Sequence, residues 1–218
     1  SISHDLRAPV RAVLGFGEIL ERRHLEALPQ EGREYLAYIL DAGRQMDALI
    51  DALLRFARVD REAVELVPLD PVGVATEIAT HFRPILSETG GTIHIDRHLP
   101  QVVADPQRLE SVLQNLFENA VKYRHPERPL RLRVEGSQAG DGPELRVMDN
   151  GLGIPPGDRD RVFGLFERTA ATRDIPGSGM GLAIVRRAMD RMGGSVHLED
   201  GPGGEGLAVV LRFEESLP

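Results

Sequence analysis

The sequence contains no cysteine and no tryptophan, and aromatic residues make up only 5% of its 218 residues. The absence of cysteine excludes disulfides, thiolate metal sites and thiol nucleophiles, and nothing points to an oxidising compartment, so we expect a cytoplasmic protein. No apolar run approaches the ~18 residues of a membrane span, which predicts no direct insertion into a membrane. The formal net charge of −8 disfavours binding to nucleic acid, because a polyanion requires a basic face.

Two stretches of different character follow one another along the chain. Residues 1 to about 60 contain few prolines and glycines and read as helix almost throughout. The remainder alternates short β-like runs, helical patterns and clusters of glycine and proline. Because the helical pattern ends near Val59–Leu66, the sequence predicts two domains, residues 1–62 and 63–218.

Apolar residues in the first domain recur at alternating intervals of three and four, which is a heptad pattern. Pro29 suits the first turn of a second helix, so we expect an antiparallel helical hairpin. Two helices cannot enclose a core, and we therefore expect a homodimer in which two hairpins form a four-helix bundle. The alternative is a hairpin that packs on the second domain of its own chain. The predicted seam comprises Leu6, Val10, Val13, Gly17, Leu20 and His24, followed by Leu36, Ile39, Gly43, Met46, Ile50, Leu53 and Ala57.

The second domain has the pattern of an α/β sandwich. Helices are expected over 71–87, from Pro106 to about Tyr123, and over 182–192. Helices and strands come in mixed order, which favours a mixed sheet with helices on one face. Residues 151–181 show little periodicity, and a loop of this length in a compact domain is typically functional or mobile. Strands are expected over 92–96, 130–135, 144–148, 195–198 and 207–213.

The first candidate site is the segment SHDLRAP at residues 3–9. Imidazole titrates near neutrality, so an exposed His4 can act as a nucleophile or base. Asp5 is adjacent and could orient the ring or accept its proton. On this heptapeptide alone, a solvated surface histidine beside an aspartate is the stronger interpretation.

The second candidate site lies on the helix that ends near Tyr123. Asn115, Asn119 and Lys122 are spaced four and three apart, hence on one helical face. Asparagine oxygens suit Mg²⁺, and Lys122 adds a point charge for a phosphate. The alternative is a polar, solvated face.

Two glycine-rich segments complete the set. In DNGLGIP, residues 149–155, Asp149 at a strand end can accept a hydrogen bond from an exocyclic amine such as that of adenine, although Asp-Asn-Gly alone is more often a turn. In GSGMGL, residues 177–182, backbone amides at a helix N-terminus can bind phosphate. The segment is neither a Walker A loop nor a Rossmann fingerprint. Between them, Phe163 and Phe166 could pin a mobile segment to a core.

Together and in this order, these motifs resemble the transmitter module of a bacterial two-component sensor histidine kinase. His4 matches the phosphoacceptor of the H box, and the sequence motif HDLRxP resembles that of the phytochrome-type branch. The resemblance implies an α+β protein: a dimeric hairpin that carries the histidine, then a Bergerat-type ATP-binding α/β sandwich like that of gyrase and the heat-shock-90 chaperones. The other matches are Asn115 and Asn119 to the N box, Asp149, Gly151 and Gly153 to the first glycine box, Phe163 and Phe166 to the F box, and Gly177, Gly179 and Gly181 to the second glycine box.

The resemblance implies that His4 is autophosphorylated from Mg²⁺-ATP and that the phosphoryl group passes to an aspartate of a response regulator. Asp5 would orient or deprotonate the imidazole, Asp149 would bind the adenine amine, and Asn119 would hold Mg²⁺. Alternatives are a protein that mainly dephosphorylates its regulator, or a non-catalytic, ATP-binding dimeric scaffold. The remaining ATP-binding residues would be Asn115, Lys122, Tyr123, Gly151, Gly153, Gly177, Gly179, Gly181 and Leu182, with a lid over about 154–178.

Two positions depart from the family pattern. Asp5 stands where glutamate is usual. Ala8 stands four residues after His4, where many members have a threonine or asparagine that positions water for dephosphorylation of the regulator. Phosphatase activity through that residue is therefore not expected. Because the chain starts three residues before His4, we also expect that an upstream sensory domain belongs to a longer receptor.

Overall fold

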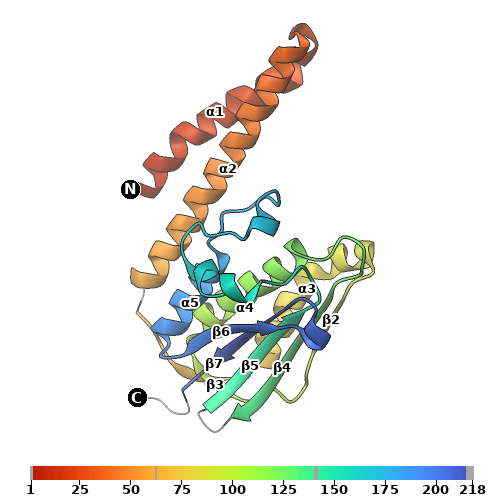
Figure 1. Ribbon diagram of the computed structural model, residues 1–218. Coiled ribbons are helices and arrows are strands. Elements are labelled where there is room, and N and C mark those ends of the chain that lie inside the picture. The colour runs from red at the N-terminus through yellow and green to blue at the C-terminus, as the bar shows by residue number, and fades with distance from the viewer. Residues whose placement is uncertain (1, 62, 140–141, 215–218) are drawn as a thin grey trace. The chain divides into compact units, whose positions relative to one another are not determined.

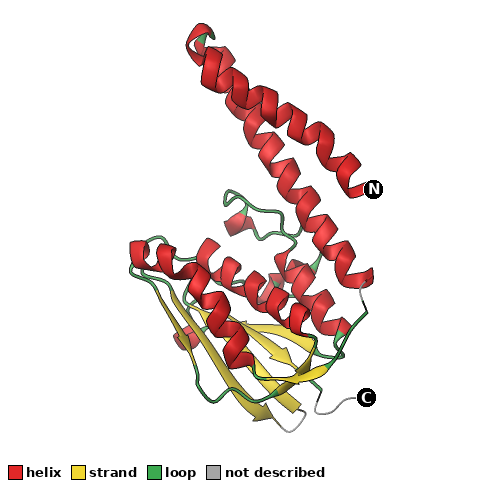
Figure 2. Ribbon diagram, turned by 180° about the vertical axis from the view of Figure 1, so that it is seen from behind, coloured by secondary structure: helices red, strands yellow, loops and turns green. Residues whose placement is uncertain are grey.

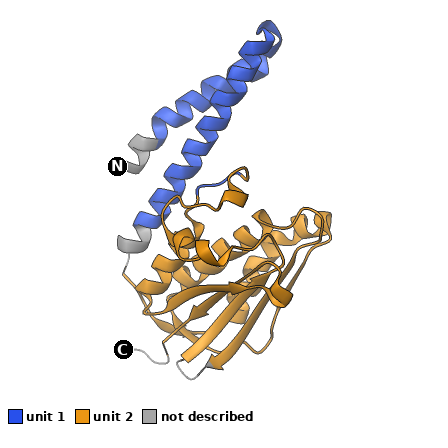
Figure 3. Ribbon diagram, in the orientation of Figure 1, with its two compact units in different colours: residues 1–57, 176–178 blue, residues 58–175, 179–218 orange. Residues whose placement is uncertain are grey.

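The computed structural model describes residues 2–61, 63–139 and 142–214, except for the side chains of residues 2–6, 58–61 and 139. It divides into two compact units, residues 1–57 with 176–178 and residues 58–175 with 179–218 (Figure 3). Among the described residues, no helix combines the length and the apolar character needed to cross a membrane.

The first unit is the predicted antiparallel hairpin (Figure 1). Helix α1 spans Ile2–His24, a short 3₁₀ turn covers Leu25–Ala27, and helix α2 spans Gln30–Arg61. Glycine brings the two helices close together: a Cβ at Gly17 would lie 2.7 Å from Leu40, and one at Gly43 would lie 2.7 Å from Leu14. A larger side chain at either position would have to displace the leucine that packs against it.

The contact within one hairpin uses only part of the predicted seam. Leu36 and Gly43 are buried, but so is Leu40, which was not assigned to the seam. The predicted seam residues Ile39, Met46 and Leu53 are instead exposed. The residues of α2 that are buried within one hairpin therefore lie on a different face of the helix from the exposed apolar residues Ile39, Met46 and Leu53. On α1 the predicted seam residues Val13 and Leu20 are exposed as well. Further large apolar side chains exposed on the hairpin are Phe16, Ile19, Leu25, Tyr35 and Tyr38.

The second unit is a mixed five-stranded sheet with the order β2-β4-β5-β7-β6. Within the described strands of this sheet, β2 and β4 pair in parallel and the other neighbours pair antiparallel. Helices α3, α4 and α5 lie on one face of this sheet, as the sequence predicted (Figures 1 and 2). The strands are β2 Thr92–Ile95, β4 Arg131–Ala139, β5 Gly142–Asp149, β6 Ser195–Asp200 and β7 Leu207–Arg212; a separate antiparallel pair joins β1 Val67–Leu69 and β3 Val102–Ala104.

The helix starts follow from local chemistry. The Asp70 carboxylate accepts the N–H of Val72 at the start of α3 (Pro71–Thr89), and the Asp105 carboxylate accepts the N–H of Arg108 at the start of α4 (Pro106–Lys122). Helix α5 spans Gly181–Arg191. The core between helices and sheet is apolar and centred on α4. Its fully buried side chains include Leu109, Leu113, Phe117, Leu132, Leu145, Met189 and Leu211.

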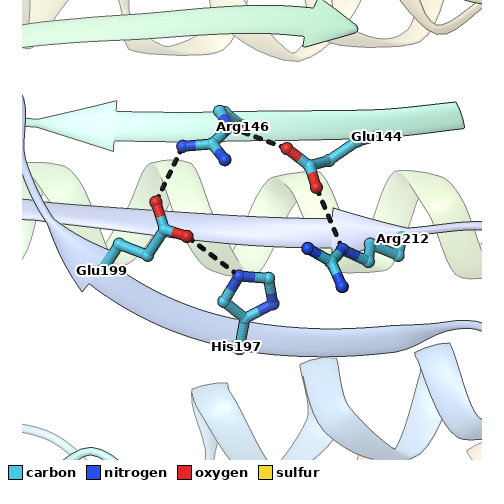
Figure 4. A network of polar contacts seen from close by, with 5 residues as sticks. All are labelled: Glu144, Arg146, His197, Glu199 and Arg212. Carbon is cyan, nitrogen blue, oxygen red and sulfur yellow. Dashed lines mark hydrogen bonds and ion pairs between the residues drawn. The ribbon is translucent and has the colours of Figure 1, made fainter. Parts of the chain in front are cut away.

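The other face of the sheet carries a network of charged side chains (Figure 4). Buried Glu144 accepts hydrogen bonds from Arg146 at 2.7 Å and from Arg212 at 3.0 Å. Arg146 also bonds Glu199, which contacts His197. Burial by itself would raise the pKa of Glu144, but the two arginines outweigh it and hold this pKa below its ordinary value. The charges on this face therefore compensate one another.

Candidate functional site

Helix α4 presents its amide side chains toward the start of α5. A Cβ at Gly181 would lie 3.2 Å from the Asn119 amide nitrogen and 3.5 Å from the Asn115 amide oxygen. Asn115 donates to the Ser111 carbonyl at 2.7 Å, which fixes its orientation. Among the described residues, none hydrogen-bonds the side-chain amide of Asn119. The amide that was predicted to hold a metal is thus available to a ligand.

The turn after β5 meets the end of α4. The N–H of Leu152 donates to the Tyr123 carbonyl at 3.0 Å, and a Cβ at Gly151 would collide with the same carbonyl. Lys122 lies over the Tyr123 ring, 4.6 Å from its centre. Gly153 adopts φ +69°, a left-handed conformation that favours glycine. The two predicted motifs are therefore in contact, although they are about 30 residues apart in the sequence.

Asp149 is the most perturbed carboxylate of this site. Its side chain is largely buried, and burial raises its pKa to about 6. Backbone N–H groups of Gly151 and Leu207 and the charge of Arg128 act in the opposite direction. The Gly151 bond measures 2.7 Å. The protein's own hydrogen bonds and charges stabilise the ionised carboxylate only in part. A ligand that donates a hydrogen bond to Asp149 would stabilise it further.

The segment between the glycine boxes is ordered by three 3₁₀ turns, Pro156–Asp158, Arg161–Phe163 and Ala170–Thr172. Phe163 is buried, with the Arg186 guanidinium 3.8 Å from its ring centre. Phe166 departs from the prediction that both phenylalanines pin the segment. It is 51% exposed and adopts φ +62°, a strained value for a non-glycine residue.

The backbone at Phe166 packs closely against Gly179. A Cβ at Gly179 would lie 2.8 Å from the Glu167 carbonyl and 2.9 Å from the carbonyl carbon of Phe166, so the F box lies against the second glycine box. Gly179 itself adopts φ +70°. The turn at Phe166 thus directs its ring away from the core.

The structure brings most of the predicted ATP-binding residues together in the second unit. Half-buried Leu182 begins α5 beside Gly181. Gly177 falls in the short segment grouped with the hairpin. His4 and Asp5 lie on α1, but their side chains are outside the described set, so their orientation stays a prediction.

Sequence reasoning missed Arg128, which bonds the Asn150 and Gly151 carbonyls. Arg128 belongs to no motif, and its partners are backbone atoms 22 and 23 residues away. No local signal in the sequence marks such a contact.

Comparison with known proteins decides the family. Residues 1–62 match the model of the His Kinase A (phospho-acceptor) domain, and residues 104–217 match that of the histidine kinase-, DNA gyrase B-, and HSP90-like ATPases. The chain belongs to the sensor histidine kinases. It therefore has the phosphoacceptor domain and the ATP-binding domain of this family, in the order that the sequence predicted.

Relatives of this kinase chain come from several bacteria. It is 31% identical to the phytochrome-like protein Cph1 of Synechocystis over 92% of this chain and 27% of that protein. It is 32% identical to the sensor histidine kinase AruS of Pseudomonas aeruginosa over 100% of this chain and 22% of that protein. The crystal structure of full-length ShkA in complex with AMPPNP matches with a TM-score of 0.69 and 31% identity, over 100% of this chain and 46% of that one. The chain thus spans about a quarter of the length of these curated relatives.

Proposed function

We propose that this chain is the catalytic part of a sensor kinase that phosphorylates its own His4 from Mg²⁺-ATP and passes the phosphoryl group to an aspartate of a response regulator. The observation that carries the proposal is that Gly181 lies against Asn119 of α4 while the turn after Asp149 packs against Tyr123 at the end of the same helix. This domain follows a phosphoacceptor hairpin. We assign residues 1–62 to dimerisation and phosphoacceptance and residues 63–218 to ATP binding and catalysis.

Asp149 recognises the adenine. Its carboxylate lies at the end of β5, held by the Gly151 N–H, and accepts a hydrogen bond from the exocyclic amine. Lys122 and Tyr123 line the phosphates and ribose. Gly177, Gly179 and Gly181 let the triphosphate approach the backbone at the start of α5, where Leu182 follows. Residues from about 154 to 178 close over the nucleotide as a lid.

Mg²⁺ fits this site through Asn119, assisted by Asn115. Asparagine offers a single neutral oxygen, so an ion held by Asn119 would keep phosphate oxygens and water as its other ligands. A side chain at position 181 would crowd both amides, since its Cβ would lie 3.2 Å from the Asn119 amide nitrogen and 3.5 Å from the Asn115 amide oxygen. The bound ion would neutralise charge on the phosphates.

His4 is the nucleophile, and Asp5 orients or deprotonates its imidazole. Phosphoryl transfer has a loose transition state, so positioning and charge neutralisation dominate the step. The γ-phosphorus gains a bond to the imidazole nitrogen and loses its bond to ADP, while the imidazole proton passes to Asp5 or to solvent. The exposed stripe of Ile39, Met46 and Leu53 supports a homodimer, because a second hairpin would cover it.

The alternative of a mainly phosphatase protein is weakened by Ala8. Its methyl group offers no hydrogen bond to a water molecule, and it is exposed on α1 one turn after His4. The scaffold alternative is weakened because Asn119 and the glycine boxes are intact, which favours a chain that uses its ATP.

The test incubates the protein with Mg²⁺ and γ-labelled ATP beside His4→Gln and Asn119→Ala. We expect acid-labile, alkali-stable label on the native protein and none on either variant. Label that persists on His4→Gln contradicts the assignment of the nucleophile. Nucleotide binding without any label would favour the scaffold, and rapid loss of phosphate from a phosphorylated regulator would favour the phosphatase.

A further inference from the structure

One arginine outside every family motif holds the turn that carries Asp149. Arg128 lies in the loop between α4 and β4. Its Nε donates to the Asn150 carbonyl at 2.8 Å and its Nη2 to the Gly151 carbonyl at 3.2 Å. Its Nη1 lies 2.5 Å from the Glu205 carboxylate in the turn between β6 and β7. A single guanidinium therefore joins three segments that are distant in sequence.

The same turn is enclosed by independent contacts. The Asn150 side chain accepts the Arg131 N–H at 2.7 Å and donates to the Pro129 carbonyl at 3.0 Å, which ties the turn to the α4–β4 loop. On the other side, a Cβ at Gly206 would collide with the Asp149 carbonyl, and one at Gly153 would lie 2.8 Å from the Gly206 carbonyl. The turn has little freedom to move, and Arg128 spans both of its sides.

Two ion pairs lie beside the turn that carries Asp149. Glu205 is paired with Arg128, and Arg159 is paired with Asp200 on β6. Arg128 is the cation whose charge lowers the pKa of Asp149 against the effect of burial. Its guanidinium thus acts on Asp149 in two ways, through the backbone of the turn and through space.

We propose that Arg128 is a positioning residue for nucleotide binding, which fixes the Asp149 turn between the α4–β4 loop and the β6–β7 turn so that the carboxylate meets the adenine amine. This inference rests on the proposed function, because Asp149 is there the adenine-binding group. Lysine at position 128 would keep the charge but lose the planar fork, whereas glutamine would lose both. The two contributions can therefore be separated.

The experiment measures the dissociation constant of Mg²⁺-ATP by calorimetry from about pH 5.5 to 8, with the melting temperature of each variant. Arg128→Lys weakens binding about tenfold at the upper pH, as expected for loss of hydrogen bonds to the turn. Arg128→Gln weakens ATP binding further. It also raises the pH at which half of the affinity is lost, because the charge that lowers the pKa of Asp149 is gone. Glu205→Gln changes affinity by about twofold or less, because Glu205 is 61% exposed and such ion pairs contribute little.

Arg133→Gln is the matched control, since Arg133 is an exposed arginine on β4 whose recorded contact is an ion pair with Glu135. The inference is overturned if native protein binds ATP and both Arg128 variants match this control in affinity and pH midpoint. It is also overturned if they lower only the melting temperature. If Arg128→Gln does not fold, Arg128→Lys decides. Failure of the native protein to bind ATP would instead overturn the proposed function itself.

Discussion

Replacement of Asp149 by asparagine separates what this residue does for the fold from what it does for the ligand. Burial raises the pKa of Asp149 from 3.8 to about 6, so the folded protein favours the neutral carboxyl. This rise in pKa means that the folded protein loses about 3 kcal/mol of stability once the carboxyl group is ionised. Asparagine stays neutral and keeps an oxygen for the Gly151 N–H, but it gives up about 1 kcal/mol of hydrogen bonding. Asp149→Asn should therefore raise the free energy of unfolding by about 2 kcal/mol near pH 8.

The contribution of Asp149 to the stability of the folded protein changes with pH. Because the folded pKa lies above the unfolded one, the contribution of Asp149 is fully present below about pH 3.8 and is lost as the pH rises through about 6. When the pH falls from 8 to 5, the free energy of unfolding of the native protein should rise by about 1.4 kcal/mol relative to that of the variant.

Urea unfolding of both proteins without nucleotide at about pH 5 and 8 measures this gap, and calorimetry measures ATP affinity. The variant should bind ATP at least about tenfold more weakly, since it loses a charged hydrogen-bond acceptor. A variant that is less stable than the native protein at pH 8, or that keeps full affinity, would refute the reasoning.

Three further predictions follow from the packing. Replacing Arg146 and Arg212 together by methionine should lower the free energy of unfolding by about 3 kcal/mol, because buried Glu144 is left unpaired. Adding Glu144→Gln should restore most of this stability, and urea titration of the two variants measures both changes. Gly181→Ala should leave the melting temperature unchanged or higher but weaken Mg²⁺-dependent ATP binding about tenfold or more, since its Cβ would lie 3.2 Å from the Asn119 amide; equal affinity would argue against the metal assignment. Ile39→Glu with Met46→Glu should give a monomer in sedimentation analysis that still binds ATP, while Arg44→Ala should leave the dimer intact.

The elements that sequence reasoning placed well have strong local signals. Helices α3 and α4 begin where Asp-Pro supplies a cap and a compatible first residue, and their ends differ from the prediction by one or two residues. The mixed sheet with helices on one face followed from the order of patterns. Strand β3 was missed, because three residues, Val102–Ala104, are too few for an alternating pattern to show. Strand β4 extends to Ala139, beyond the predicted end at Glu135, because it pairs with β5.

The misassigned parts depend on contacts between distant segments. A heptad pattern marks apolar positions on α2 but does not distinguish contacts within one hairpin from those between two, so Leu40 was missed and Ile39 was grouped with Leu36. Phe166 has the same residue type as Phe163, and the residue type alone does not distinguish the exposed ring from the buried one. Arg128 reads as one more charged loop residue until its carbonyl partners are placed beside it.

The central claim is that the phosphoryl group of ATP ends on His4. The most direct measurement is mass-spectrometric mapping of the phosphorylation site after incubation of the native protein with Mg²⁺-ATP under neutral conditions that preserve phosphohistidine. We expect modification of His4 in the native protein and none in Asp149→Asn at ATP concentrations that this variant does not bind. Modification at another residue, or none on a protein that binds ATP, would contradict it.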